Sequence, residues 1–103
     1  MPTSAKATTR LILELVESHR TRVHALGRSA PSAARVFELV AREIVLTIPR
    51  AAKELELSQP TVGKAATRLQ RLGILDEVTG RYRNKIYVYS DHLALLTEGT
   101  EVS

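Results

Sequence analysis

The segment of residues 47–73 constrains the fold most, because two helical patterns follow each other there with only a short turn between them. In the first pattern, apolar residues recur at helical spacing at Ile48, Ala52 and Leu55, which predicts a short amphipathic helix. The turn that follows is too short to let the two helices lie antiparallel. A short helix, a tight turn and a longer helix are the layout of a helix-turn-helix.

The second helix has recognisable start and stop signals. Ser58 is a good N-cap, because its hydroxyl can accept the backbone N–H of Thr61. Pro60 falls in the first turn, where its missing N–H matters little, and Gly73 supplies the C-terminal stop. We expect the buried stripe of this helix to contain Val62, Ala65 or Ala66, Leu69 and Leu72.

The opposite face of the second helix is polar and basic, with Thr61, Lys64, Arg68 and Arg71 at helical spacing. In a helix-turn-helix the second helix enters the major groove of DNA. The alternative is a solvated helix face with an N-cap, and a cation at Arg71 suits the helix dipole equally well. The residues of this helix expected to contact DNA are Ser58, Gln59, Thr61, Lys64 and Arg68.

After Gly73 the hydrophobic pattern changes to the alternation of β-strands. Residues 74–79 and 86–89 predict two short strands joined through a basic loop, in which Gly80 and Asn84 can take positive φ. A basic hairpin directly after the second helix predicts the wing of a winged-helix domain. The alternative is an exposed hairpin that its charges keep soluble. The wing residues expected to contact DNA, the basic ones through phosphates, are Arg81, Arg83, Asn84 and Lys85.

Two further helices are predicted before this segment. Residues 9–26 form an amphipathic helix with a broad leucine-rich face, capped by Thr8 or Thr9 after a frayed start. That face either packs on its own domain or forms a dimer or interdomain contact. Ser32 caps the next helix, over residues 33–45, and Phe37, the only phenylalanine, is expected at the centre of the core.

Together these patterns predict a mainly α chain with a small β-hairpin: a winged helix-turn-helix preceded by an N-terminal amphipathic helix. Residues 1–28 would be the N-terminal helix, linker or dimerisation element, and residues 29–96 the winged helix-turn-helix domain. Residues 97–103 would be a disordered, acidic tail. Leu46 is expected to form a stub of strand, and Tyr87 and Tyr89 to pack on the sheet.

Composition excludes several classes of protein. No apolar run approaches the roughly 20 residues that a transmembrane helix needs, and no apolar signal core begins the chain, so we expect a cytoplasmic protein without a membrane partner. The absence of cysteine excludes disulfides and cysteine-based zinc sites. His19, His24 and His92 lack the spacing of a metal site or a catalytic triad. We therefore predict no metal, no cofactor and no enzymatic activity.

From about residue 47 to residue 100 the chain resembles the winged-helix domain at the C-terminal end of many bacterial Fic-family proteins. The resemblance rests on the run LSQPTVGKAATRLQRLGIL, the hairpin TGRYRNKIYVY and the ending DHLALLTEGT. The His-Pro loop through which Fic enzymes transfer AMP does not occur in this chain. The resemblance therefore implies a detached or excised accessory domain, with a Fic domain as a partner and no catalytic residue of its own.

The leading functional prediction is a module that binds double-stranded DNA, as a bacterial transcriptional regulator or as the accessory domain of a Fic-type protein, and that forms a homodimer through the N-terminal helix. The alternative is a docking module that uses the same fold to bind a protein. The net charge of +4 is modest, but its placement favours DNA. Residues 58–85 contain six basic side chains (Lys64, Arg68, Arg71, Arg81, Arg83 and Lys85) and two acidic ones (Asp76 and Glu77).

Overall fold

Helices make up most of the chain that the computed structural model describes, residues 3–80 and 84–101. These residues contain five α-helices, one short 3-10 helix and a three-stranded antiparallel sheet, so the expected mainly α class is confirmed. The helices are α1 (Thr3–His24), η1 (Gly27–Ser29), α2 (Ala30–Glu43), α3 (Ile48–Leu55), α4 (Gln59–Arg71) and α5 (Ser90–Glu101). The strands are β1 (Val45–Thr47), β2 (Asp76–Glu77) and β3 (Ile86–Val88).

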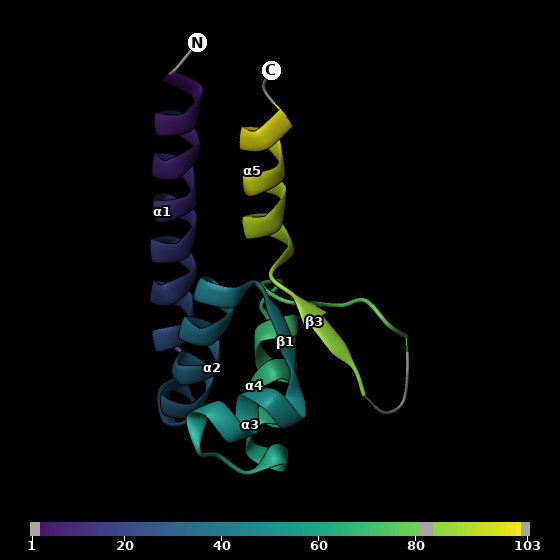
Figure 1. Cartoon of the computed structure of the whole chain (residues 1–103). Coiled ribbons are helices and arrows are strands. Elements are labelled where there is room, and N and C mark those ends of the chain that lie inside the picture. The colour runs from purple at the N-terminus through teal and green to yellow at the C-terminus, as the bar shows by residue number, and fades with distance from the viewer. Residues whose placement is uncertain (1–2, 81–83, 102–103) are drawn as a thin grey trace.

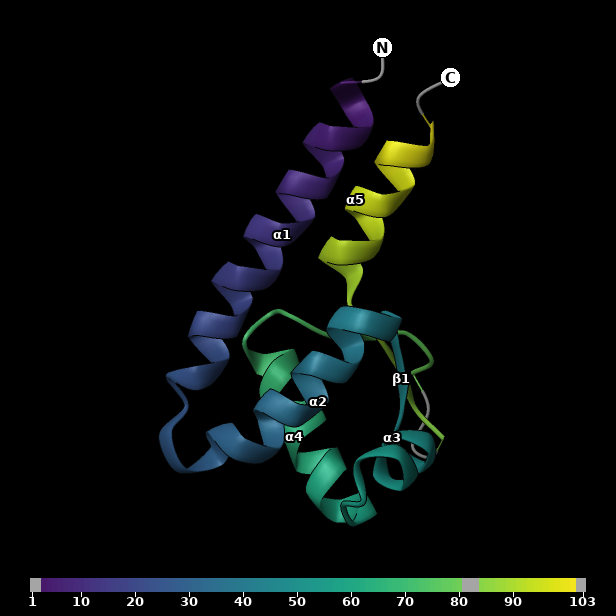
Figure 2. The ribbon, with the colours of Figure 1, turned by 60° about the vertical axis from the view of Figure 1, so that its left-hand side comes forward.

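The molecule has a helical body and a two-helix arm (Figure 1). The body consists of α2, α3, α4 and the sheet. The arm is formed by α1 and α5, which run antiparallel and side by side, so that the beginning of α1 and the end of α5 lie at the same end of the molecule (Figure 2). Its lower part packs on α2 and joins the core of the body.

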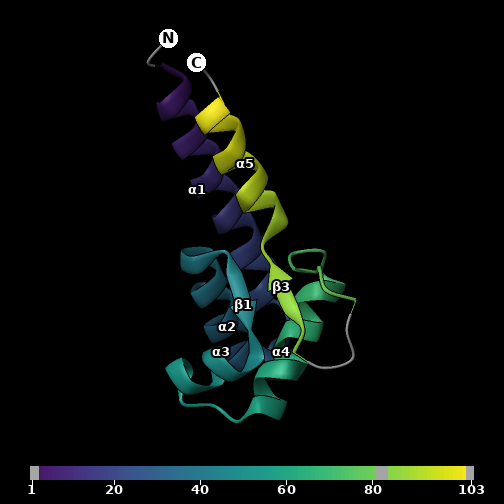
Figure 3. The ribbon, with the colours of Figure 1, turned by 45° about the vertical axis from the view of Figure 1, so that its right-hand side comes forward.

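The sheet has β3 in the centre, with β1 on one side and β2 on the other. Figure 3 shows β1 and β3 side by side. Leu46 of β1 and Glu77 of β2 both pair with Tyr87 of β3. The strand stub expected at Leu46 is therefore confirmed as β1, which pairs with β3. It adds a third strand to the predicted hairpin of β2 and β3. Burial explains the pairing, since Leu46 and Tyr87 are only 2% and 4% exposed.

The core lies between α2, α4, the sheet and the lower part of α1. Phe37 is fully buried, and its ring centroid lies 5.8 Å from that of Tyr89, which is also fully buried. The central position expected for Phe37 and the packing role expected for the two tyrosines are confirmed. The other fully enclosed large side chains are Val23, Val36, Val40, Leu46, Val62, Leu69, Ile74 and Leu75.

Both α-helices before β1 begin earlier than the capping signals predict. α1 begins at Thr3, so Thr8 and Thr9 lie inside the helix and the frayed start over residues 1–8 is wrong from Thr3 onward. The alanines and Lys6 in this stretch are good helix formers, which favours the extension. α2 begins at Ala30, and Ser32 is in its first turn instead of capping it, because Pro31 is well suited to that turn.

The ends of two elements also differ from expectation. α2 ends at Glu43 because Ile44 takes a φ of 73°, in the left-handed region, and turns the chain into β1. The Ile44 carbonyl then accepts the backbone N–H of Tyr89 at 2.8 Å, which holds this turn against β3. α5 extends to Glu101, so residues 97–101 are helical and do not form a disordered tail. Packing of α5 along α1 accounts for the added turns.

Among the helices that the structure describes, none combines the length and the hydropathy required to cross a bilayer.

Candidate nucleic-acid interface

The turn between α3 and α4 fixes how α4 is presented. Glu56 ends α3 with a φ of 55°, and Ser58 then caps α4, its hydroxyl accepting the backbone N–H of Thr61 at 3.2 Å. The Ser58 hydroxyl also lies 2.7 Å from the Thr61 hydroxyl. The predicted N-cap is confirmed, and two of the expected DNA-contacting side chains are engaged with each other in the free protein.

The other end of α4 is fixed equally firmly. Gly73 takes a φ of 79°, and the N–H of Ile74 donates to the carbonyl of Leu69 at 3.0 Å, a Schellman-type ending. From α1, Arg22 donates through Nη2 to the carbonyl of Leu72 at 2.6 Å. Because both ends are fixed, the outer face of α4 is held at a defined angle to the body.

α4 separates its apolar and basic residues cleanly. The buried face contains Val62, both Ala65 and Ala66, and Leu69, whereas Leu72 is only half-buried. The exposed side chains of the opposite face are those of Gln59, Lys64, Thr67, Arg68 and Arg71.

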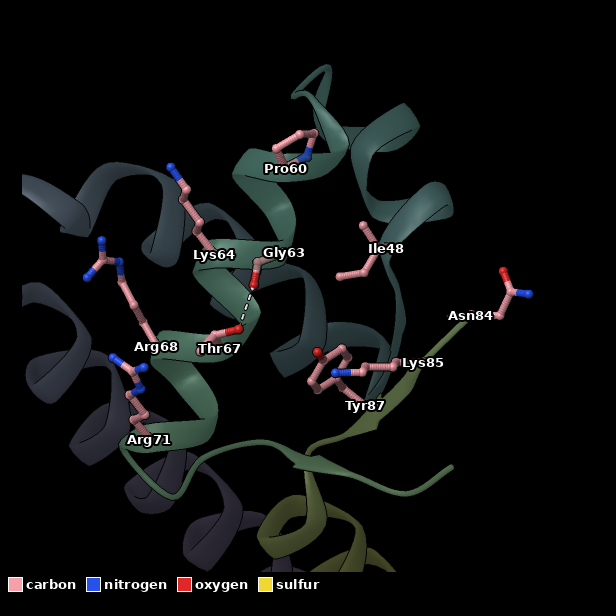
Figure 4. Close-up of a pocket in the computed structure, with 10 residues that line it drawn as sticks. All are labelled: Ile48, Pro60, Gly63, Lys64, Thr67, Arg68, Arg71, Asn84, Lys85 and Tyr87. Atoms are coloured by element: carbon pink, nitrogen blue, oxygen red, sulfur yellow. Dashed lines mark hydrogen bonds between the residues drawn. The ribbon is translucent and has the colours of Figure 1, made fainter. Parts of the chain in front are cut away.

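A groove of about 630 Å³ runs along this outer face, between α4, the start of α3 and the β3 side of the hairpin. Lys64, Arg68 and Arg71 project on one side of α4, whereas Tyr87, Lys85 and Asn84 lie on the other side (Figure 4). Gly63 and Thr67 lie between them on α4, and the Thr67 hydroxyl donates to the Gly63 carbonyl at 3.0 Å. We call it the hairpin groove, and it is lined by Ile48, Pro60, Gly63, Lys64, Thr67, Arg68, Arg71, Asn84, Lys85 and Tyr87.

The cations of this groove form no ion pair within the described part of the chain. The ion pairs found there belong to Arg20 and Arg50, which contact Glu17, Glu38, Glu43 and Glu54. Arg22 and Arg35 are engaged differently, since each donates to a carbonyl at the end of a helix. Within residues 3–80 and 84–101, no ion pair involves Lys64, Arg68, Arg71 or Lys85. Lys64, Arg68 and Arg71 are exposed, whereas Lys85 is half-buried and its charge contributes to lowering the pKa of Glu77.

The predicted hairpin loop is organised by Glu77, a residue that sequence reasoning missed. Its carboxylate accepts the backbone N–H groups of Thr79 at 2.7 Å and Gly80 at 2.8 Å, and the Thr79 hydroxyl as well. These hydrogen bonds, the one from the Thr79 hydroxyl above all, lower the pKa of Glu77 below its ordinary value. The available signal was an acidic residue shortly before the turn Gly80, which takes the expected positive φ of 64°.

The expected wing residues divide into two pairs. Arg81 and Arg83 lie outside the described residues. Asn84 has the expected positive φ of 55° and is exposed, and Lys85 is half-buried where it lines the groove. Of the residues expected on α4, the structure brings Lys64 and Arg68 to the groove with Asn84 and Lys85, whereas Ser58, Gln59 and Thr61 lie outside its lining.

Two of the three histidines belong to the core. His19 and His92 are buried and both contact the ring of Tyr89, while His24 is exposed. Among the described residues, no group of three or more His, Asp or Glu side chains could hold a metal ion.

The lining of the groove along α4 consists of cations, hydroxyls and apolar surface, a combination suited to an anionic ligand.

Comparison with protein-family models and with curated proteins finds no match for this chain.

Proposed function

We propose that the protein binds double-stranded DNA as a winged helix-turn-helix module. In this proposal α3 and α4 form the helix-turn-helix, α4 enters the major groove, and the hairpin of β2 and β3 is the wing. The resemblance of residues 47–100 to the C-terminal domain of Fic proteins supports a role as a transcriptional regulator or as an accessory domain of a Fic-type protein.

One observation carries the proposal: unpaired cations from two separate elements face one open groove. Lys64, Arg68 and Arg71 come from α4 and Lys85 from the hairpin. Lys64, Arg68 and Arg71 lie on one side of α4 and Lys85 on the other, so an anionic ligand that follows the outer face of α4 can be stabilised by cations on both sides of it. The phosphate backbone of a duplex is such a ligand, and its repeating charges match a row of cations better than a single small anion does.

The exposed side chains of α4 also suit contact with base edges. Gln59 at the exposed start of α4 and Lys64 one turn further can hydrogen-bond to bases, while Arg71 and Lys85 suit phosphates. A protein-docking groove would instead place large apolar anchors on the outer face of α4. On α4 itself the exposed positions are polar or charged apart from Pro60, which favours DNA over a docked protein at this surface.

A second copy of the chain is the partner that we propose for the arm. Leu11 and Leu13 of α1 are 49% and 65% exposed, and Leu93 of α5 is 44% exposed. These leucines lie on the two helices that project from the body, away from the groove (Figure 1). Dimers of helix-turn-helix proteins bind two DNA half-sites at once, so self-association through the arm would fit the DNA-binding role.

Fluorescence anisotropy with a labelled random duplex at several salt concentrations tests the DNA proposal. We expect binding that weakens steeply with salt. Lys85→Ala, which removes a phosphate-contacting cation, should lower the log–log salt slope by about one. Arg10→Ala, an exposed cation of the arm, is the matched control and should leave the slope unchanged. Absence of binding at low salt with about 100 μM protein, the weak limit of ordinary non-specific affinity, would overturn the proposal.

A further inference from the structure

A second, smaller groove of about 200 Å³ runs along α4. It lies between α4 and the segment where η1 leads into α2. Arg28 of η1 and Ser32 in the first turn of α2 contribute to it, and neither residue is part of the hairpin groove. We call it the Arg28 groove, lined by Arg28, Ser32, Thr61, Lys64, Ala65 and Arg68.

The two grooves share Lys64 and Arg68. Both side chains project from α4 on the side away from Ile48 and Lys85 (Figure 4). They are therefore placed to contact a ligand on the flank of α4 opposite the hairpin. The outer face of α4 therefore forms a ridge, with the hairpin groove on one side and the Arg28 groove on the other.

The chemistry of the Arg28 groove is that of a phosphate site. Three cations and two hydroxyls line it and no carboxylate does, and no ion pair within the described residues involves Arg28, Lys64 or Arg68. The guanidinium groups of Arg28 and Arg68 can each donate two parallel hydrogen bonds to phosphate oxygens, and the Ser32 hydroxyl can donate one more.

The geometry of DNA predicts that the two protein grooves face different strands. A helix in the major groove has the phosphate backbone of one strand on each flank, because the two strands form the two edges of that groove. In the proposed function, the hairpin contacts the phosphate backbone on one flank of α4. We propose that the Arg28 groove binds phosphates of the opposite strand, so that α4 is held in the major groove from both sides. This inference rests on the proposed DNA binding.

Phosphate ethylation interference on a selected duplex, with each strand labelled in turn, tests the inference. The unchanged protein should show interference on both strands. Arg28→Ala should lose interference on one strand and Lys85→Ala on the other, each with a log–log salt slope lower by about one. Arg10→Ala should retain the full pattern, and unchanged melting temperatures would verify that the variants fold.

The outcomes separate the two claims. Full interference and an unchanged salt slope for Arg28→Ala would overturn the inference while leaving DNA binding in place. Loss on the same strand for Arg28→Ala and Lys85→Ala would also overturn it, because the two grooves would then follow one backbone. If the unchanged protein binds no duplex, the proposed function and this inference both fail.

Discussion

The Nδ1 atom of His19 lies 2.7 Å from the phenolic oxygen of Tyr89, a buried hydrogen bond between residues 70 positions apart. Tyr89 follows β3 directly and precedes α5, so the bond ties α1 to the point where the arm leaves the sheet. The same ring packs on Phe37, and it meets His92 edge-on with centroids 5.3 Å apart. Burial raises the pKa of Tyr89, which keeps the phenol neutral and able to donate.

Tyr89→Phe should lower the free energy of unfolding by about 1–3 kcal/mol, because it leaves a buried imidazole nitrogen of His19 without its partner while the ring packing is kept. Urea melts monitored by circular dichroism would measure the change. Tyr87→Phe is the control, since the Tyr87 hydroxyl has no hydrogen bond among the residues described. A loss below about 0.5 kcal/mol for Tyr89→Phe would mean that the hydrogen bond adds little net stability.

The stability of the fold should fall as the solution becomes acidic. Burial lowers the pKa of both His19 and His92, the nearby Asp91 partly opposing this at His19. The unfolded chain therefore takes up protons first, below about pH 6.5. The free energy of unfolding has its highest value above that pH and declines as the pH falls. The decline ends once the pH is below the pKa values of the two histidines in the folded protein.

Urea melts at a series of pH values between about 7.5 and 5, on either side of the unperturbed histidine pKa, would measure this decline. His19→Gln and His92→Gln should each make it shallower. A decline that is as steep in both variants as in the unchanged protein would contradict the assignment to the buried pair.

Phe37→Ala should destabilise the fold by about 3–5 kcal/mol, through the lost transfer energy of a fully buried ring and the cavity that remains. Denaturant melts would measure it. A loss below about 1 kcal/mol would show that the site collapses around the smaller side chain, contrary to a tightly packed core.

Gly63 is a position where stability and DNA binding should change in opposite directions. It lies within α4, where Gly is less favourable than Ala by about 0.5–1 kcal/mol, and an added Cβ would meet no described atom within 4 Å. Gly63→Ala should therefore raise the free energy of unfolding. It should also weaken duplex binding, because Gly63 lies in the middle of the hairpin groove where a ligand must approach closely. Unchanged or tighter binding would mean that the ligand leaves room there.

Local signals predicted the centre of this fold well. The N-cap at Ser58 and the stop at Gly73 depend on hydrogen bonds between residues only a few positions apart. The local sequence is therefore enough to predict them. The division of α4 into an apolar and a basic face follows from helical periodicity alone.

Features that depend on residues far apart could not be read in the same way. A strand stub was expected at Leu46, but its pairing with Tyr87 was not. α5 continues to Glu101 because α1 lies beside it. The Arg28 groove depends on how α2 packs on α4, so Arg28 and Ser32 carry no signal of their own. Arg81 and Arg83, predicted for the wing, lie outside the described residues and stay predictions.

The most direct test of the central claim is one titration series that compares α4 with the hairpin on a selected duplex and on a scrambled one, at several salt concentrations. Lys85→Ala should weaken binding to both duplexes similarly, since phosphates are alike in every sequence. Gln59→Ala and Lys64→Ala should cost about 1–3 kcal/mol on the selected site in excess of any loss on the scrambled one. Equal losses on both duplexes for all three variants would contradict base contact by α4, and no loss for any of them would contradict DNA binding at this face.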